Sequence, residues 1–188
     1  MAAHAPLSSP IRPSMASQRM RQLMPEDFPF VTSVADAWWG GRPVRHLMPR
    51  LFFEHFTNTS FAVPSENVLS GFLIGFQSQA LPSVAYLHFV GVAPEARGQG
   101  IARSMYSAFF AKVHQLGCTQ VRCITSPMNV ASVAFHRALG FEVKPSESVE
   151  NGVPVAKDYA GPGQSRVLFT KMLHPSVPPD PSLERTVT

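Results

Sequence analysis

One stretch of the chain, residues 83–110 (SVAYLHFVGVAPEARGQGIARSMYSAFF), limits the fold more than any other. Its first half alternates as a strand does, with two sets of side chains on opposite faces: Val84, Tyr86, His88 and Val90 on one, Ala85, Leu87 and Phe89 on the other. Pro94 ends this strand because proline cannot donate a hydrogen bond to a neighbouring strand. The second half carries apolar residues every three or four positions, which predicts a helix over residues 98–116 that Gly117 ends. Strand, turn and helix together favour an α/β domain.

The turn between this strand and this helix is rich in glycine, and it reads Arg97-Gly98-Gln99-Gly100-Ile101-Ala102. Glycine lets a ligand approach the backbone, and the first turn of a helix offers unpaired N–H groups at the positive end of its dipole. Such a turn binds phosphate, and Arg97 adds a positive charge. The alternative is a glycine-rich turn without a ligand. A Walker loop is excluded because Ile101 and Ala102 stand where Lys-Ser/Thr is required, and a dinucleotide fingerprint because Arg103 stands where it needs glycine.

The composition favours a single domain and argues against two kinds of partner. At 188 residues, with 45% hydrophobic content, the chain can bury one ordinary core. Its net charge of +4 is small and its positive residues are scattered, so we expect no nucleic-acid partner. No apolar run approaches the ~18 residues of a membrane span, so we expect no membrane partner.

The two cysteines predict a reduced, cytoplasmic protein. Cys118 and Cys123 lack the C-x-x-C spacing of redox and metal sites, and on a single strand they should face opposite sides as core residues. No cluster of His, Cys and Asp has metal-ligand spacing, so we expect no metal.

Two blocks of sequence resemble one known family. Arg-x-x-Gly-x-Ala at residues 97–102, placed after a strand, resembles the acyl-CoA loop of the GNAT N-acetyltransferases. Residues 129–143 (NVASVAFHRALGFEV) are similar to that family's second block, with an asparagine, a short helix and a closing Leu-Gly-Phe in the expected order. The resemblance implies an α/β GNAT-like acyl-CoA N-acyltransferase fold, with a mixed, mostly antiparallel central sheet flanked by helices.

The expected domain runs over residues 18–173, between a disordered tail at 1–17 and a proline-rich disordered tail at 174–188. Within it the sequence predicts strands at 18–23, 60–64, 68–78, 119–125, 141–144 and 166–173 besides the central one. Further helices are predicted at 25–39, 44–56 and 129–139, and a long polar loop is expected before the last strand.

The resemblance assigns a binding site for acetyl-CoA. In this family the strand before the loop bulges and its backbone pairs with the pantetheine arm; here that backbone is Val90, Gly91 and Val92. The pyrophosphate is expected on the loop that follows, and an asparagine on the second block often binds the CoA arm. The implied loop and arm residues are Arg97, Gly98, Gln99, Gly100, Ile101, Ala102 and Asn129. For Asn129 the alternative is a helix N-cap, and the two roles are compatible.

The catalytic candidates lie on the central strand and the second block. His136 stands where the family usually has a tyrosine that protonates the departing thiolate, and an imidazole can do this work. The alternative is a histidine that fills space or binds a backbone carbonyl. Tyr86 and His88 occupy the side of the strand where some relatives place a glutamate, and either could hold a water that takes the amine's proton; His88 as an ordinary strand residue is the alternative. Glu54 and its neighbour His55 are weaker candidates.

The amine acceptor is expected between two loops. The first contains Trp38, Trp39 and Arg42, where one indole is expected to close the core and the other to line an aromatic pocket with Arg42. The second contains Asp158 and Tyr159, which would pair with and pack over a cationic acceptor; a solvated turn is the alternative.

The resemblance implies an enzyme that passes an acetyl group from acetyl-CoA directly to a primary amine of a small molecule, without a covalent intermediate. Two alternatives stay open at this point: a non-catalytic acyl-CoA-binding module, and an enzyme that acetylates protein N-termini or lysines. A homodimer is compatible with the sequence.

Overall fold

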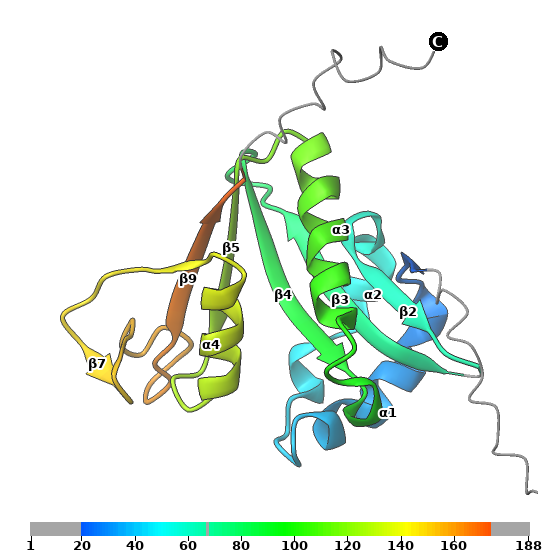
Figure 1. The fold of residues 1–188 in the computed structure, drawn as a ribbon, viewed down its shortest axis with the longest axis horizontal. Coiled ribbons are helices and arrows are strands. Elements are labelled where there is room, and N and C mark those ends of the chain that lie inside the picture. Colours follow the sequence, from blue (N-terminus) through cyan, green and yellow to red (C-terminus); the bar gives the residue numbers. More distant parts are fainter. Residues whose placement is uncertain (1–19, 67, 174–188) are drawn as a thin grey trace, which may run out of the picture.

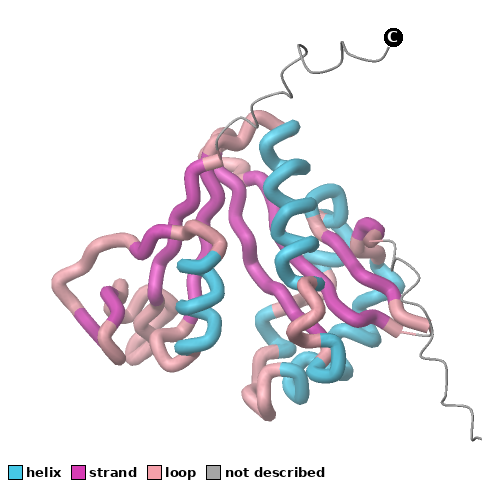
Figure 2. The backbone as a smooth tube through the Cα atoms, viewed as in Figure 1, coloured by secondary structure: helices cyan, strands magenta, loops and turns pink. Residues whose placement is uncertain are grey.

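The computed structural model describes residues 20–66 and 68–173 (Figures 1 and 2). The tails expected at 1–17 and 174–188 lie outside the described residues, as do the first two positions of the strand expected at 18–23.

Seven strands of the described part form one sheet in the order β1-β2-β3-β4-β5-β9-β6, and β7 and β8 form a separate hairpin. Among these paired strands only β4 and β5 run parallel, so the expected mixed, mostly antiparallel sheet is confirmed. The strands are β1 Arg21–Gln22, β2 Phe61–Pro64, β3 Leu69–Gln77, β4 Val84–Val92, β5 Gln120–Thr125, β6 Glu142–Val143, β7 Val149–Glu150, β8 Val153–Pro154 and β9 Val167–Met172.

Helices cover both faces of this sheet (Figure 1). The four α-helices are α1 Phe28–Trp38, α2 Leu51–His55, α3 Ile101–Gln115 and α4 Val130–Ala138. Short 3-10 helices occupy Pro25–Asp27, Arg45–Leu47, Thr57–Thr59 and Pro94–Ala96. Within residues 20–66 and 68–173, none of the helices combines the length and the apolar character that crossing a bilayer requires.

Two hydrophobic clusters hold the helices to the sheet. The larger one lies under α3 and α4 and includes Leu87, Phe109 and Phe169. The smaller one lies under α1 and α2 and includes Phe53 and Phe72. Residues Leu69 to Gly75 of β3 are buried on both faces because this strand lies between the two layers. The unbroken apolar run of β3 is therefore explained by its central position.

The helix expected at residues 44–56 is shorter than predicted. Residues 45–47 form a 3-10 turn, and α2 begins only at Leu51. Pro49 lies between them, and a proline removes a backbone donor and disfavours the helical conformation in the residue before it. The apolar spacing predicted one helix, but the proline divides it.

The loop expected before the last strand contains a hairpin that the sequence did not predict. Val149 pairs with Pro154 and Glu150 with Val153, around a turn in which Asn151 and Gly152 have φ angles of 50° and 74°. Asparagine and glycine are the residues that tolerate such angles, so Asn151-Gly152 was the available signal.

The prediction that both cysteines lie on one strand and face opposite sides is wrong. Cys118 precedes β5 and Cys123 lies on it, yet both side chains are buried in the cluster under α3 and α4. Gly117, with a φ of 86°, ends the turn after α3, and Cys118 follows it. The N–H of Cys118 donates to the carbonyl of Val113. Both thiols are free.

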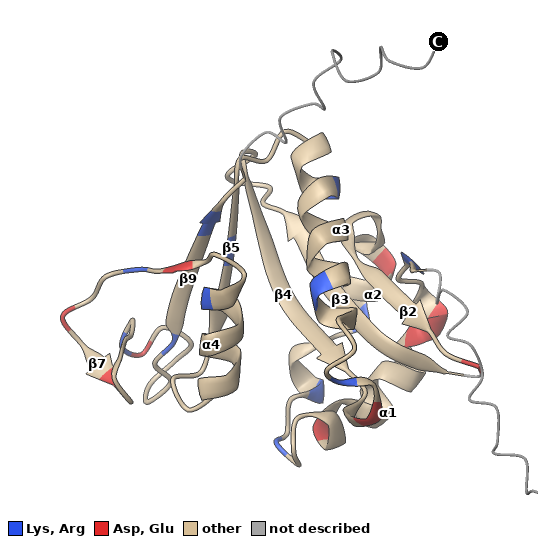
Figure 3. Ribbon diagram, in the orientation of Figure 1, with Lys and Arg blue, Asp and Glu red and all other residues tan. Residues whose placement is uncertain are grey.

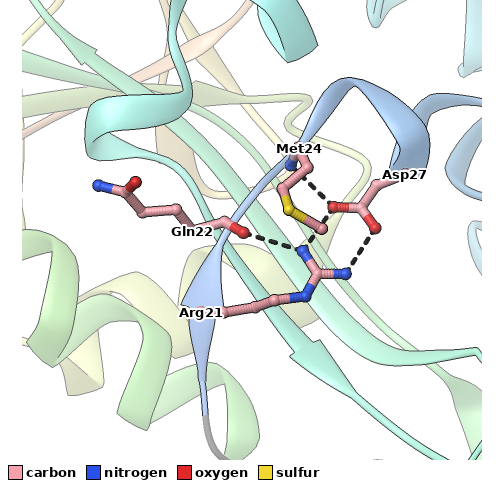
Figure 4. Close-up of polar contacts among 4 residues, drawn as sticks. All are labelled: Arg21, Gln22, Met24 and Asp27. Atoms are coloured by element: carbon pink, nitrogen blue, oxygen red, sulfur yellow. Dashed lines mark hydrogen bonds and ion pairs between the residues drawn. The ribbon is translucent and has the colours of Figure 1, made fainter.

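One ion pair fixes the start of the domain (Figure 4). The guanidinium of Arg21 on β1 donates to both carboxylate oxygens of Asp27, at 2.8 and 2.7 Å. The same carboxylate accepts a hydrogen bond of 2.8 Å from the N–H of Met24. The bidentate geometry ties β1 to the turn that opens α1.

Candidate active site

The strands β4 and β5 part in the middle of the sheet, where the candidate site lies (Figure 1). They pair only through Val84↔Gln120, Ala85↔Val121 and Tyr86↔Arg122. Beyond Tyr86, residues 87–92 of β4 have no described strand partner on the side of β5, while β5 stays paired with β9 up to Thr125. Backbone groups along this edge are available to a ligand that carries amides of its own.

The central strand bulges at His88. Leu87 pairs with Gly75 and Phe89 with Ile74, so His88 is an extra residue between two consecutive pairs. The backbone that the resemblance assigns to the pantetheine arm, residues 90–92, begins two residues after this bulge. The alternation predicted for β4 fails at the same point: Phe89 packs on the α1 side and Val90 on the α3 side.

Gly91 has a packing role on the α1 side of the sheet. A Cβ atom built on it would lie 2.6 Å from the ring of Phe72 and 2.7 Å from the indole of Trp39. These rings occupy the space that a side chain would fill. The absence of a side chain at Gly91 therefore allows these two aromatic rings to approach the backbone of β4 closely.

The glycine turn opens α3 as the sequence predicted. Gly98 and Gly100 have φ angles of 76° and 81°, which favour glycine, and Gly100 is the N-cap residue. No side chain caps this end of α3, so the first N–H groups of the helix are available. Because glycine has no side chain to block the backbone, and because this end of the helix dipole is positive, a phosphate can bind at the turn.

Arg97 is held by backbone groups on two neighbouring elements. Its guanidinium donates to the carbonyl of Trp38, at 2.6 Å, and to that of Val92, at 3.3 Å. The side chain joins the end of α1 to the end of β4 and so fixes the turn's position. The amide of Gln99 donates to the carbonyl of Glu95 at 3.3 Å.

His136 lies in the interior, between α4 and the sheet. It is 6% exposed, and its ring stacks on Phe169 with the ring centroids 4.8 Å apart. Nδ1 lies 2.7 Å from the carbonyl of Ser132 and Nε2 lies 2.9 Å from the hydroxyl of Tyr106 on α3. Because a carbonyl only accepts, Nδ1 carries the proton and Nε2 accepts from Tyr106. Burial lowers the pKa of His136, although the hydrogen bond with Ser132 opposes this shift.

This arrangement is the alternative that the sequence left open, a histidine bound to a backbone carbonyl. Tyr106 was not singled out from the sequence, although it follows Met105 in the buried stripe of the helix. Asn129 likewise shows its alternative role, since its side chain accepts a hydrogen bond of 3.2 Å from the N–H of Ser132 as an N-cap.

Tyr86 and His88 lie on the α2 side of β4. His88 stacks on Phe52 at 4.5 Å, and its Nε2 lies 2.7 Å from the carbonyl of Leu47. Nε2 must donate in this bond, so the neutral ring has its lone pair on Nδ1, for which the described residues provide no hydrogen-bond partner. Burial lowers the pKa of His88 and raises that of Tyr86. At neutral pH the imidazole is thus uncharged and the phenol protonated.

The loop after α1 is packed more tightly than predicted. Both indoles are half-buried against the smaller cluster: Trp38 stacks on Phe72 at 6.0 Å, and Trp39 lies 4.9 Å from Phe89. Both indoles thus contact the core, and the lining of an acceptor pocket by one of them with Arg42 stays a prediction. Asp36 fixes the far end of this loop, because its carboxylate accepts from the N–H groups of residues 44 and 45, and the bond to residue 45 chiefly lowers its pKa.

The charged acceptor candidates are exposed and bound to neighbours. Arg42 donates to the carbonyl of Trp39 at 3.1 Å. Glu54 pairs with Arg50 at 2.6 Å on the surface of α2. Asp158 accepts from the N–H of Gly163 at 2.7 Å, which is the solvated turn that the sequence left as an alternative.

Tyr159 is 53% exposed and lies in the same turn. Tyr159 and Arg166 both influence the pKa of Tyr86, so both side chains lie near its phenol. Arg166 was not singled out from the sequence, and its position at the start of the last strand was the available signal. The described residues contain no group of three or more His, Cys, Asp and Glu side chains placed to hold a metal ion.

Solved structures share this fold. Ard1 from Thermoplasma volcanium superimposes with a TM-score of 0.67 at 15% identity, covering 84% of this chain and 98% of that one. Diaminobutyrate acetyltransferase from Paenibacillus lautus, solved with L-2,4-diaminobutyric acid and coenzyme A, gives 0.62 at 19% identity, covering 85% and 98%. The fold is that of the GNAT acetyltransferases.

The sequence itself decides the family. Residues 18–141 match the Acetyltransferase (GNAT) family, and the chain belongs to it. The L-2,4-diaminobutyric acid acetyltransferase of Methylotuvimicrobium alcaliphilum is 31% identical over 85 residues, 45% of this chain and 49% of that protein. That of Wolinella succinogenes is 30% identical over 91 residues, 47% and 53%. The chain matches about half the length of these curated relatives.

Proposed function

We propose that the chain is an N-acetyltransferase that moves the acetyl group of acetyl-CoA directly to a primary amine of a small molecule. Membership of the GNAT family supports the reaction, and the relatives named diaminobutyric acid acetyltransferases support a small amine as acceptor. The observation that carries the proposal is the parted edge of β4, which leads directly into the uncapped glycine turn at the start of α3.

The two parts of this surface suit two parts of acetyl-CoA. The free edge at residues 87–92 offers N–H and C=O groups, apart from the Val92 carbonyl that Arg97 binds, to the amides of the pantetheine arm. The N–H groups at Gly98, Gln99, Gly100, Ile101 and Ala102 offer positive dipole ends to the pyrophosphate. Arg97 contributes by holding the turn against α1 and β4. Acetyl-CoA supplies an activated thioester.

His88 is the residue that we assign as the base. The amine must lose a proton to attack the thioester carbon, and Nδ1 of the neutral His88 ring carries a lone pair for it, directly or through one water. A C–N bond forms, the C–S bond breaks, and the thiolate leaves and takes up a proton. Holding the amine against the thioester supplies much of the rate.

The first test is release of the CoA thiol from acetyl-CoA with a panel of amines that includes diaminobutyrate, other amino acids, polyamines and peptides. We expect turnover on a small amine, and His88→Asn should lower kcat/KM for it by about 10²-fold, a typical effect of losing a general base. His46→Asn, in the loop after α1, is the matched control and should not change it.

A non-catalytic acyl-CoA-binding module is the second candidate function. The observation that favours it is His136, which is buried and hydrogen-bonded at both ring nitrogens where the family usually has a proton-donating tyrosine. Binding of acetyl-CoA in a calorimeter without thiol release on any amine would replace the enzyme with this module. Turnover on peptides alone would indicate an enzyme that modifies proteins.

A further inference from the structure

A continuous group of aromatic rings lies on the α2 side of the sheet. It consists of Phe52, Phe56, Phe76, Tyr86 and His88, and is called the aromatic surface below. Phe52 lies 4.5 Å from His88 and 5.3 Å from Phe56, Phe56 lies 5.1 Å from Phe76, and Phe76 lies 5.6 Å from Tyr86, all between ring centroids. Every one of the five side chains is partly exposed.

Stability does not account for all of these rings. Phe52 packs against the cluster under α1 and α2, but Phe56, Phe76 and Tyr86 belong to neither hydrophobic cluster. They contact one another and keep part of their surface in water. Partly exposed rings that contact one another in this way offer a surface on which an apolar group can pack.

The position of the aromatic surface relates it to the reaction. Tyr86 is the last residue of β4 that pairs with β5, so the rings begin where the two strands part. His88 follows at the bulge, with the imidazole that we assign as base. An acceptor whose nitrogen is near Nδ1 of His88 would place its body along these rings.

The strands that carry Phe76, Tyr86 and His88 offer no carboxylate to a second ammonium group. β3 and β4 contain no charged residue (Figure 3). Asp158, in the loop near Tyr86, has its carboxylate bound to the N–H of Gly163. Two arginines lie beside Tyr86: Arg122 is its register partner on β5, and Arg166 acts on it electrostatically. Neither forms an ion pair with a carboxylate of the described residues.

Glu54 does not supply the missing negative charge. It lies two positions from both Phe52, on α2, and Phe56, which follows the helix, whereas these two rings contact each other. Its carboxylate is paired with Arg50 on the surface.

We propose that the acceptor is a primary amine with an aromatic or similarly large apolar body, without a second positive charge, and that Phe52, Phe56, Phe76 and Tyr86 bind that body. This inference rests on the proposed N-acetyltransferase function and narrows its substrate class. The proposed acceptor differs from the diamino acid after which the curated relatives are named.

The test compares 2-phenylethylamine, butylamine and 2,4-diaminobutyrate as acceptors in the thiol-release assay. We expect kcat/KM to be highest for the aromatic amine, by about tenfold or more, since burying a ring-sized apolar group is worth about that factor. Phe76→Leu and Phe56→Leu should each raise the KM for 2-phenylethylamine by about tenfold and leave the KM for acetyl-CoA unchanged.

Phe30→Leu is the matched control, because Phe30 is a half-buried ring on α1 that packs on Trp38, outside the aromatic surface. It should leave both KM values unchanged. Preference for diaminobutyrate, or variants that do not alter the KM for the aromatic amine, would overturn the inference while the acetyltransferase stands.

If no amine is acetylated, the proposed function fails and calorimetry decides the inference separately. Binding of 2-phenylethylamine to the CoA-loaded protein that Phe76→Leu weakens would support the aromatic surface as a binding site. Absence of binding to the unaltered protein would overturn it.

Discussion

At the scale of single residues, the hydrogen bond between Tyr106 and His136 is the most consequential contact. It joins α3 to α4, thirty positions apart in the sequence, inside an otherwise apolar and aromatic environment. A buried polar pair is costly unless both members are satisfied, and here each ring nitrogen and the hydroxyl has a partner. The pair therefore fixes the neutral form of His136 and the relative position of the two helices.

This pair makes stability depend on pH. Burial lowers the pKa of His136 in the folded protein below its unfolded value of about 6.5, so the unfolded chain binds the proton more readily. The stability contribution is complete above the unfolded pKa and is lost as the pH falls through the folded pKa. Between pH 7.5 and 5.5, the free energy of unfolding in urea should fall by up to about 1.4 kcal/mol per pH unit from this group.

His136→Gln should reduce that pH dependence, since glutamine does not titrate. His88 also has a lowered pKa and should leave a remaining slope. Equal slopes for the unaltered protein and His136→Gln would show that His136 does not titrate as inferred.

At the scale of elements, the central strand β4 carries most of the site, and its packing depends on Gly91. A methyl group there would collide with the rings of Phe72 and Trp39, which are held by their own aromatic neighbours. Gly91→Ala should lower the free energy of unfolding by about 1–3 kcal/mol, the usual cost of overpacking. The measurement is a urea denaturation curve.

Gly71→Ala on β3 is the control for this prediction. Its added methyl group would meet the carbonyl oxygen of Gly91, a methyl group of Ile101 and the flexible end of Met105, each at 3.1 Å, and so farther away than the rings that crowd Gly91. It should therefore cost less than Gly91→Ala. A larger loss for Gly71→Ala would contradict the ranking.

The elements also show how much of the fold could be predicted from the sequence. Periodicity and the two GNAT-like blocks predicted the order of the seven sheet strands and four main helices, and the glycine turn, because these features are local, but they did not predict the hairpin of β7 and β8. The bulge at His88 could not be predicted, since an extra residue leaves no mark until the pairing with Ile74 and Gly75 is known. The partner of His136 was missed because Tyr106 lies thirty positions away, and the sequence does not show that α3 and α4 meet there.

At the scale of the whole molecule, the parting of β4 and β5 gives the sheet two arms (Figure 1). One arm carries α3 and the other α4, and a ligand along the edge of β4 would lie between them. Acetyl-CoA should therefore slow amide hydrogen exchange in peptides that cover residues 87–92. At about 100 times its Kd, it should also stabilise the fold by about 2.7 kcal/mol.

Peptides covering β5 and β9 provide the internal control, because these strands already pair along Gln120–Thr125. Their exchange should change little. Protection confined to other segments, with residues 87–92 unaffected, would place the ligand elsewhere.

The two buried thiols have a practical consequence for the whole fold. Cys118 and Cys123 are 0% and 2% exposed, and burial raises the pKa of each, so both stay protonated and unreactive while the domain is folded. A chromogenic thiol reagent added to the enzyme should then measure the released CoA, because the thiols of the folded protein react with it very little. Without substrate, the same reagent would react with these cysteines only when the protein unfolds, so the rate of that reaction would measure the rate of unfolding.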